Sequence, residues 1–279
     1  MLCCSLNKLR NYRTLKANDV QKKLFDAGIL NSKQEALWII GHALKIGNAE
    51  ILLRDEFSHD EELRINALIS RRINREPLQY ILGEADFYGR DFEVGKGVLI
   101  PRHDTETLID GVKECFSRDE AFTFLDWGTG SGCIAVTILL EFPKSEGVML
   151  DVSPDALNYA RKNLTRYQLD ERATFSVTGN FDLIISNPPY IPSCEIDGLM
   201  RDVRDFEPRN ALDGGHDGMK FYREIFTLAI NTLKHGGYII FETGNLQQVN
   251  EIENYAGFKA VNKIFDTGNF PRCIILRRL

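Results

Sequence analysis

The chain has 279 residues, of which 43% are hydrophobic and 27% charged, a balance typical of a globular protein with a buried core. Its formal net charge of -6 is unevenly placed: residues 1–85 carry 13 Lys and Arg against 11 Asp and Glu, and the remainder carries 21 against 29. An acidic C-terminal part is a poor match for a phosphate backbone, whose binding relies on several Lys or Arg contacts. We therefore expect no direct nucleic-acid binding.

The six cysteines show neither a Cys-x-x-Cys pair nor a Cys/His group at zinc spacing. They are expected to be reduced thiols of a cytoplasmic protein with no metal site, with Cys115 and Cys133 as small core residues. Cys3 and Cys4 fall in a start that we expect to be disordered. No apolar run reaches the roughly 20 residues that a membrane span needs, so no membrane role is expected.

Residues 17–85 show helical periodicity and predict a small helical bundle, which we assign as a domain over 1–85. Ser32 is expected to cap a helix, with Glu35 completing a capping box three residues later. A second apolar pattern at helical spacing covers Glu61–Asn74. None of these residues has the composition of a catalytic group.

Residues 86–100 are rich in glycine and predict a short β-hairpin that links this bundle to a catalytic domain over 101–279. In that domain helical patterns alternate with apolar runs of strand length, which predicts an α/β fold with a mostly parallel sheet. The last two strands, near 258–264 and 272–278, are too close for a crossover helix and must form an antiparallel hairpin. The preceding strands are expected at Phe122–Trp127, Gly147–Asp151, Ala173–Val177, Phe181–Ser186 and Gly237–Glu242.

A glycine-rich turn follows the first of these strands and opens a helix. Glycines at a spacing of two allow a tight turn and a close approach of a ligand to the backbone, and the helix N-terminus offers free N–H groups to an anion. The dinucleotide fingerprint is absent, because Cys133 stands where its third glycine would be. A ligand with a carboxylate and an adenosine, such as S-adenosylmethionine, fits this loop, although a purely structural turn fits it as well. The candidate cofactor contacts are Gly128, Thr129, Gly130, Ser131 and Gly132.

Asp151 ends the second strand, where α/β nucleotide-binding folds place an acid that binds ribose hydroxyls. The alternative role is an N-cap, since Asp151 and Ser153 both precede the helix that Pro154 begins. We favour ribose binding by Asp151 and capping by Ser153.

The sequence Asn187-Pro188-Pro189-Tyr190 directly follows the strand Phe181–Ser186, at the edge of the sheet where such folds bind ligands. The prolines make the turn stiff and leave carbonyl groups unpaired. The Asn187 side-chain oxygen and the Pro188 carbonyl could accept both N–H bonds of a planar amide and direct its nitrogen toward a methyl donor. Tyr190 could pack against the planar group. Asn187, Pro188 and Tyr190 are therefore the candidate catalytic residues, and all four residues are candidates for substrate binding, with Asn187 also facing the cofactor.

These motifs resemble the protein-(glutamine-N5) methyltransferases of peptide chain release factors, the PrmC/HemK family. The resemblance covers about residues 20–279. It implies a Rossmann-like S-adenosylmethionine-dependent methyltransferase domain behind a substrate-docking helical bundle, with the glutamine of a Gly-Gly-Gln loop as acceptor and S-adenosylhomocysteine as the second product. Peptide chain release factors would then be the partner. Further stretches that carry the resemblance are Arg71–Gly83, Phe87–Gly89, Val98–Arg102, Phe206–Leu212 and Gly214–Gly218.

The chain departs from the family pattern at three places. Residues 102–106 read Arg-His-Asp-Thr-Glu, without the proline of the family, from which we expect little effect. Only five residues separate Phe175 from Phe181, where the family usually has several more and an acid or aromatic residue beside the adenine. No residue of this chain can be carried over to that adenine contact. Trp127 stands where the family usually has a smaller residue, and we expect it to be a core tryptophan.

Two other functions remain open from the sequence. An adenine N6 methyltransferase would present the same planar amino group to the same motif, although it would also grip phosphates. A non-catalytic S-adenosylmethionine-binding docking protein would agree with the short segment after Phe175. The segment Ile191–Asp217 is long enough to be a lid or a substrate-binding loop, and a solvated loop is the alternative. Its acids, which could meet a basic surface around the acceptor, are Glu195, Asp197, Asp202, Asp205 and Glu207.

Overall fold

The computed structural model of the protein describes residues 15–176 and 178–279, so Cys3 and Cys4 lie outside the described residues. The chain divides into two compact units between Leu82 and Gly83. Each unit has a hydrophobic core of its own, and each is therefore described by itself. Within the described ranges, no helix combines the length and the apolar character that crossing a membrane would require.

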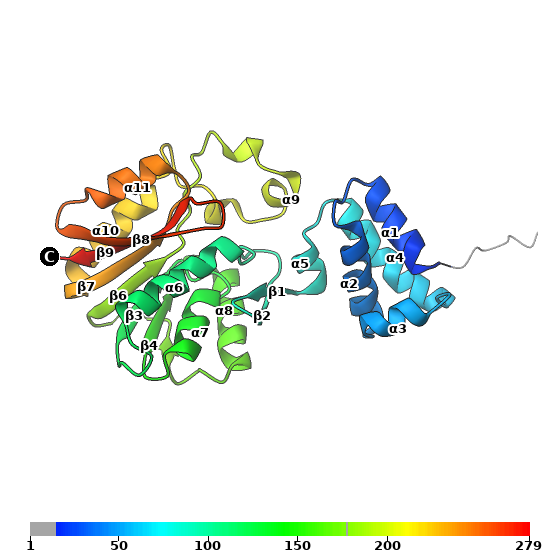
Figure 1. Cartoon of the computed structure of the whole chain (residues 1–279), viewed down its shortest axis with the longest axis horizontal. Helices are drawn as coiled ribbons and strands as arrows, with labels where there is room; N and C mark the ends of the chain where they lie inside the picture. The colour runs from blue at the N-terminus through cyan, green and yellow to red at the C-terminus, as the bar shows by residue number, and fades with distance from the viewer. Residues whose placement is uncertain (1–14, 177) are drawn as a thin grey trace, which may run out of the picture. The chain divides into compact units, whose positions relative to one another are not determined.

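The first unit is a small bundle of helices (Figure 1). Its helices are α1 (Ala17–Asp26), α2 (Ser32–Leu44), α3 (Asn48–Leu53), α4 (His59–Ile73) and α5 (Leu78–Leu82). Apolar residues recur on one face of α1, α2 and α4 and meet in the core, where Ile39, Ile40 and Ile65 have no exposed surface. The prediction of an N-terminal helical bundle is therefore confirmed.

The predicted capping box at Ser32 and Glu35 is wrong. Asn31 is the N-cap of α2, no side chain caps the helix, and Ser32 lies buried inside it. Glu35 instead accepts a 2.6 Å hydrogen bond from Arg72 Nε on α4. The capping box of this unit is at Ser58 and Glu61, at the start of α4. Glu35, three residues after Ser32, thus forms an ion pair with a distant helix instead of a helix cap. The spacing of the two residues in the sequence is the same in both cases and cannot distinguish them.

The second unit contains a β-hairpin and a seven-stranded sheet with helices on both faces (Figure 1). Its strands are β1 (Glu84–Phe87), β2 (Arg90–Glu93), β3 (Thr123–Trp127), β4 (Glu146–Leu150), β5 (Ala173–Thr174), β6 (Phe181–Ser186), β7 (Leu233–Glu242), β8 (Phe258–Phe265) and β9 (Pro271–Arg278). Its α-helices are α6 (Glu106–Cys115), α7 (Cys133–Glu141), α8 (Pro154–Arg166), α9 (Arg201–Arg204), α10 (Lys220–Thr232) and α11 (Leu246–Glu253).

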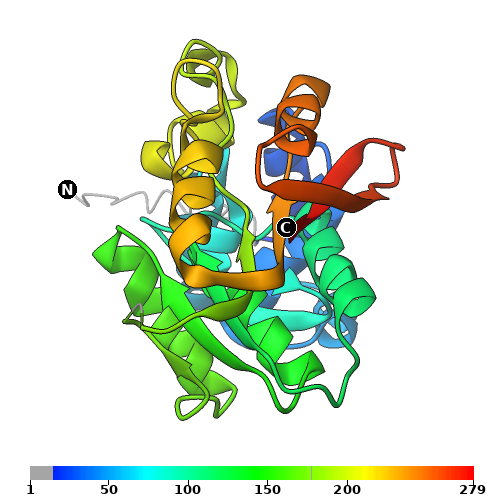
Figure 2. The same cartoon turned by 90° about the vertical axis from the view of Figure 1, so that its left-hand side faces the viewer.

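The strand order in the large sheet is β5-β4-β3-β6-β7-β9-β8. All neighbours pair in parallel as far as β7, whereas β9 pairs antiparallel with both β7 and β8. Figure 2 shows the hairpin of β8 and β9 at the orange and red end of the colour bar. The prediction of a mostly parallel α/β sheet that ends in an antiparallel hairpin is confirmed.

One face of this sheet is covered by α6, α7 and α8, and the other by α10 and α11. The hairpin of β1 and β2 belongs to the second unit, since Phe87 and Phe92 are fully buried in the core under α7 and α8. The strand expected at Ala173–Val177 is shorter than predicted. Only Ala173–Thr174 pairs with β4, and Val177 lies outside the described residues.

Candidate active site

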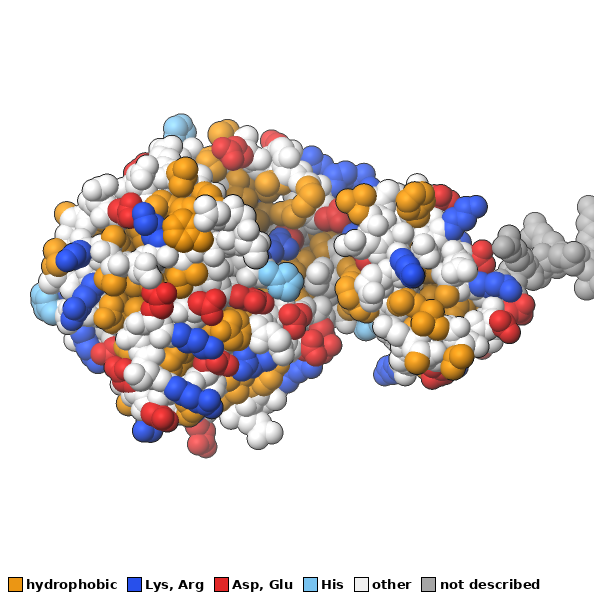
Figure 3. Space-filling view, in the orientation of Figure 1, with side chains coloured by type: hydrophobic (Ala, Val, Ile, Leu, Met, Phe, Trp, Pro, Cys, Tyr) orange, Lys and Arg blue, Asp and Glu red, His pale blue; other side chains and the backbone are white. Residues whose placement is uncertain are grey.

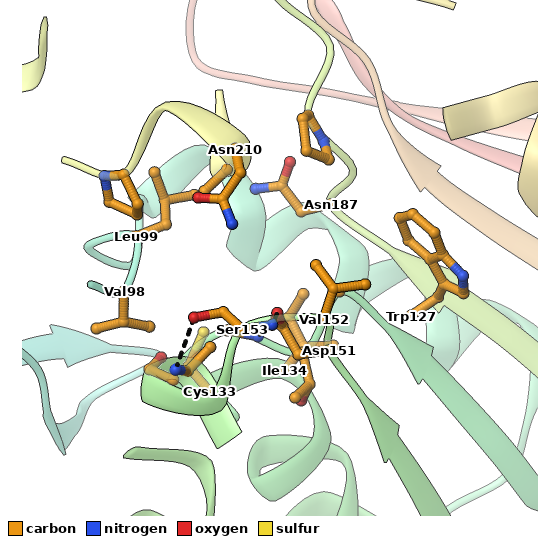
Figure 4. Close-up of a pocket in the computed structure, with 18 of the residues that line it drawn as sticks. Val98, Leu99, Trp127, Cys133, Ile134, Asp151, Val152, Ser153, Asn187 and Asn210 are labelled. Carbon is orange, nitrogen blue, oxygen red and sulfur yellow. Dashed lines mark hydrogen bonds between the residues drawn. The ribbon is translucent and has the colours of Figure 1, made fainter. Parts of the chain in front are cut away.

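A cavity of about 230 Å³ lies at the carboxyl ends of β3, β4 and β6 (Figure 4). Most of the residues predicted to form a site line it: the stretch Gly128–Ser131, Asp151, Asn187 and Pro189. Gly132, Pro188 and Tyr190 are not among its lining residues. The topology explains the convergence, because strands β3, β4 and β6 run in parallel and end at one edge of the sheet.

The glycine-rich turn forms one wall of the cavity. The amides of Gly128 and Thr129 both donate to the Leu150 carbonyl, at 2.8 and 2.9 Å, which ties the turn to the end of β4. Gly132 has φ 81°, and a Cβ there would lie 2.7 Å from Met149 Cε. The packing of Met149 against the start of α7 therefore requires a glycine at residue 132.

Beneath the turn, the Thr129 hydroxyl donates a 2.6 Å hydrogen bond to the Asp126 carboxyl group. Asp126 is fully buried, and burial raises its pKa to about 7. The side chains of Thr129 and Ser131 are themselves almost fully buried. The turn thus offers mainly its backbone to a ligand, and its polar side chains hold it in shape.

Asp151 lies at the centre of the cavity floor and keeps capacity to accept further hydrogen bonds. Its Oδ2 accepts from the Gly130 amide at 2.9 Å and its Oδ1 from the Ser153 amide at 2.8 Å. Each oxygen retains a second lone pair, which suits the paired hydroxyls of a ribose. The expected capping by Ser153 is confirmed, because Ser153 is the N-cap of α8 and its hydroxyl accepts from the Ala156 amide at 3.3 Å.

The orientation of the Asn187 carboxamide is set by a chain of hydrogen bonds behind it. Asn187 Nδ2 donates to Thr105 Oγ1 at 3.0 Å, and Thr105 in turn hydrogen-bonds Glu242, at the end of β7. Because the Thr105 proton is taken by the carboxyl group, Thr105 can only accept from Asn187. The amide NH₂ therefore faces Thr105, and no hydrogen bond engages Oδ1 within the residues that the structure describes. Asn187 lines the cavity (Figure 4).

Tyr190 connects to the same carboxyl group. Its hydroxyl donates to Glu242 Oε1 at 3.2 Å, and burial raises the pKa of Tyr190, which keeps it a donor. Gln248 Nε2 donates to the Tyr190 carbonyl at 2.8 Å, and a Cβ at Gly244 would lie 2.5 Å from the Tyr190 ring. The turn after β6 is therefore held on every side, and Tyr190 packs into the core beside the cavity rather than lining it.

Glu242 is hydrogen-bonded by both Thr105 and Tyr190. It is 1% exposed, and its Oε2 has no hydrogen-bonding partner among the residues that the structure describes. Burial raises its pKa to about 7, opposed by the hydrogen bond from Thr105 and the nearby charge of Arg272. Arg272 is itself paired with Asp104 and Asp266, at 3.2 and 3.1 Å. The carboxyl group therefore titrates near neutral pH while two hydroxyls hydrogen-bond it.

The segment Ile191–Asp217 forms another wall of the cavity through Pro208, Asn210 and Ala211. It is folded rather than merely solvated, with short helical turns at α9 and on either side of it. Glu207 was one of five acids of this segment that could meet a basic surface of a partner, and its burial leaves it little surface for such a contact. Glu207 is 5% exposed and accepts hydrogen bonds from Arg102 and the Ile100 amide. These hydrogen bonds hold the segment Ile191–Asp217 against the residues that precede α6.

Trp127 also differs from the expectation of a core residue. It is half-buried, packs partly against the core under α10, and lines the cavity, where its ring lies 5.5 Å from that of Phe221 on α10. Cys133 is buried as expected, and Cys115 is half-buried against the same core.

Three positioning residues were missed in the sequence analysis. Thr105 and Glu242 orient Asn187 and Tyr190, and Asn163 on α8 donates a 2.8 Å hydrogen bond to the Ser131 carbonyl of the glycine-rich turn. Glu242 did carry a signal, since an acid that ends an apolar strand at the ligand-binding edge of a parallel sheet is unusual for a core position. Thr105 and Asn163 carried none, because their partners are 82 and 32 residues away.

The chain is similar to known proteins over most of its length. Residues 18–83 match the family described as the PrmC N-terminal domain, and residues 105–199 match the methyltransferase small domain. The release factor glutamine methyltransferase of Geobacter sulfurreducens is 42% identical over 230 residues, which are 79% of this chain and 80% of that protein. The enzyme of the same name from Thermodesulfovibrio yellowstonii is 34% identical over 277 residues, 95% of this chain and 99% of that protein.

Among solved structures, the release factor-specific protein-(glutamine-N5) methyltransferase of Alicyclobacillus acidocaldarius is 29% identical, with 67% of this chain and 99% of that chain covered and a TM-score of 0.40. The identity and coverage of the sequence relatives are decisive. The chain belongs to the release factor glutamine methyltransferase family.

Proposed function

We propose that this protein transfers a methyl group from S-adenosylmethionine to the side-chain amide nitrogen of the glutamine in the Gly-Gly-Gln loop of peptide chain release factors. Family membership supports the reaction and the substrate. The single observation on this chain that carries the proposal is the fixed orientation of Asn187 at the cavity, whose amide NH₂ is held by Thr105 and whose Oδ1 engages no described residue.

The residues present fit S-adenosylmethionine. The glycine-rich turn presents backbone to its amino-acid part, and the carboxylate of Asp151 accepts from the ribose hydroxyls. When bound, S-adenosylmethionine supplies an electrophilic methyl group. No base is needed to begin transfer, because the amide proton becomes acidic only once nitrogen has acquired positive charge.

In the acceptor site, Asn187 Oδ1 accepts one N–H of the substrate amide and the Pro188 carbonyl accepts the other. No hydrogen bond to that carbonyl is formed within the described residues, so it is free for this role. These two bonds turn the nitrogen toward the cofactor side of the cavity. They strengthen as positive charge develops on nitrogen, so the stabilisation is greatest in the transition state. Tyr190 contributes by keeping the turn rigid through Glu242.

The helical unit is proposed as the docking surface for the release factor. Several large apolar side chains are exposed on it, which is unusual for a small bundle that serves only structure. Figure 3 shows apolar side chains on the surface of this unit. The most exposed of them are Phe25, Leu30, Leu52 and Leu53.

Transfer of labelled methyl from S-adenosylmethionine to a purified release factor tests the proposal. A release factor with Gln→Ala in its Gly-Gly-Gln loop and duplex DNA serve as parallel substrates. Label on the wild-type factor alone is expected. Label on DNA would support an adenine N6 methyltransferase instead, and cofactor binding without any transfer would support a docking protein.

A further inference from the structure

One end of the cavity is apolar and aromatic. Figure 4 shows Trp127 and Val152 beyond Asp151, on the side away from Ser153. Leu150, which ends β4, and Phe221, whose ring lies against Trp127, line the cavity as well. Val152, two residues after the end of β4, is 88% exposed, which leaves its apolar side chain available to a ligand. The exposed apolar surface here lies next to the predicted ribose site, where the base of a nucleoside would continue.

The chain segment between β5 and β6 is described except for residue 177. In the described part of that segment there is no helix, and none of its residues lines the cavity. The ends of β3 and β4 line the cavity through Trp127 and Leu150, which also pack against the core under α10. Trp127 and Phe221 line this end of the cavity from two different elements, with ring centroids 5.5 Å apart and planes inclined by 48°.

We propose that Trp127, with Val152 and Phe221, is the adenine-binding wall of the cofactor site, and that Glu224 reads the exocyclic amino group of the base. This inference rests on the proposed function, since it assumes S-adenosylmethionine as the ligand. An aromatic face is the natural partner of a nucleobase, because stacking removes apolar surface of both rings from water and every base presents a π-face.

Glu224 lies one helical turn beyond Phe221 and lines the same end of the cavity. It is exposed, and no hydrogen bond or ion pair engages its carboxylate within the residues that the structure describes. An ionised carboxylate only accepts hydrogen bonds. It therefore favours a base with an amino group at this position over one with a carbonyl oxygen.

Trp127 can be observed directly, because Trp38 is the only other tryptophan of the chain. In the full-length Trp38→Phe protein, S-adenosylhomocysteine should quench the emission of Trp127 in a saturable manner. The dissociation constant from this titration should agree with calorimetry on the wild-type protein. Calorimetry should also show that Trp38→Phe leaves the affinity unchanged.

Substitution separates stacking from simple packing. Trp127→Leu keeps an apolar side chain against the core and should weaken binding of S-adenosylhomocysteine by about tenfold or more, whereas Trp127→Phe should stay within about threefold of the wild type. Circular dichroism and thermal unfolding of both variants verify that each is folded. Wild-type affinity of a folded Trp127→Leu protein would overturn the inference and leave the proposed function standing.

The deaminated analogue S-inosylhomocysteine tests Glu224. The wild-type protein should bind it about fivefold or more weakly than S-adenosylhomocysteine, and Glu224→Ala should reduce this preference. An unchanged preference would remove Glu224 from the site. If the wild-type protein binds neither compound in calorimetry, both this inference and the proposed function are wrong, and the methyl-transfer assay will show the same.

Discussion

Two buried glutamates, one in each unit, have very different surroundings. Glu35 in the helical unit is paired with Arg72 through two hydrogen bonds, at 2.6 and 3.3 Å, so its charge is matched at short range. Glu242 in the catalytic unit is contacted by the hydroxyls of Thr105 and Tyr190, and its Oε2 has no hydrogen-bonding partner among the described residues. Burial raises the pKa of Glu242 to about 7.

The difference shows what each carboxyl group does. The Glu35–Arg72 pair joins α2 to α4 within the helical unit, so its role is structural. Glu242 is itself a buried acid, and its ionised form is costly in free energy. Its hydrogen-bonding partners, Thr105 and Tyr190, are the two side chains that hold Asn187 and the turn after β6. A buried titratable group with a raised pKa beside a cavity is typical of a functional site.

The largest expected effect follows from breaking the structural pair. Glu35→Ala leaves the Arg72 guanidinium buried without its anion, which should destabilise the helical unit by about 3–5 kcal/mol. Urea unfolding followed by the emission of Trp38, in a Trp127→Phe background, measures this loss. The double variant Glu35→Leu/Arg72→Met is the matched control and should be close to the wild type in stability. If the single variant were as stable as the double variant, the pair would have no structural role.

Asn187→Ala should lower the turnover of release factor methylation by about 2–4 kcal/mol of transition-state free energy, because one positioned acceptor for the substrate amide is lost. The measurement is kcat at saturating cofactor and release factor. Asn210→Ala is the control, since Asn210 lines the same cavity without contact to Thr105 or Glu242 in the described structure. Wild-type turnover of Asn187→Ala would contradict the proposed mechanism.

Glu242→Gln should change how stability depends on pH. Because the folded state raises the pKa of Glu242 from 4.5 to about 7, the native protein binds this proton more tightly than the unfolded chain. Wild-type stability therefore declines as pH rises between these two values, and the variant lacks this contribution. The variant should gain up to about 3 kcal/mol relative to the wild type by pH 8.

Urea unfolding at several pH values, followed by Trp127 in a Trp38→Phe background, measures this difference. The pKa of Asp126 is also raised to about 7, but Asp126 is present in both proteins and cancels in the comparison. A stability difference that does not change between pH 4 and pH 8 would show that folding does not raise the pKa of Glu242.

Thr105→Val should have the smallest effect. It should lower kcat by the equivalent of about 1–2 kcal/mol of transition-state free energy, because Asn187 Nδ2 loses its acceptor and the carboxamide is free to rotate. Affinity for the cofactor, measured by calorimetry, should change little. Thr105→Ser restores the hydroxyl and should restore turnover. A serine variant as impaired as the valine variant would indicate that the methyl group of Thr105, rather than its hydrogen bonds, is what matters.

Most of the fold could be predicted because the evidence for it is local. Strands β3, β4, β6 and β7 are continuous apolar runs separated by helical patterns, and the short segment before β9 required an antiparallel hairpin. The error at Ser32 and the missing part of the strand after Ala173 arose where tertiary contacts competed with a local pattern. The two turns of the candidate site could be predicted as well, since the glycine-rich turn and the Asn-Pro-Pro-Tyr turn are each formed by one unbroken stretch of sequence.

The sequence by itself therefore determined the order of elements, the two units, the glycine-rich turn and the acceptor turn, because each depends on neighbouring residues. Only the tertiary structure decided which way the Asn187 carboxamide faces, since Thr105 and Glu242 come from segments 82 and 55 residues away. It also decided that Trp127 and Phe221 meet at the apolar end of the cavity. Side-chain orientation in a site depends on hydrogen bonds and packing between distant segments, which periodicity and spacing do not contain.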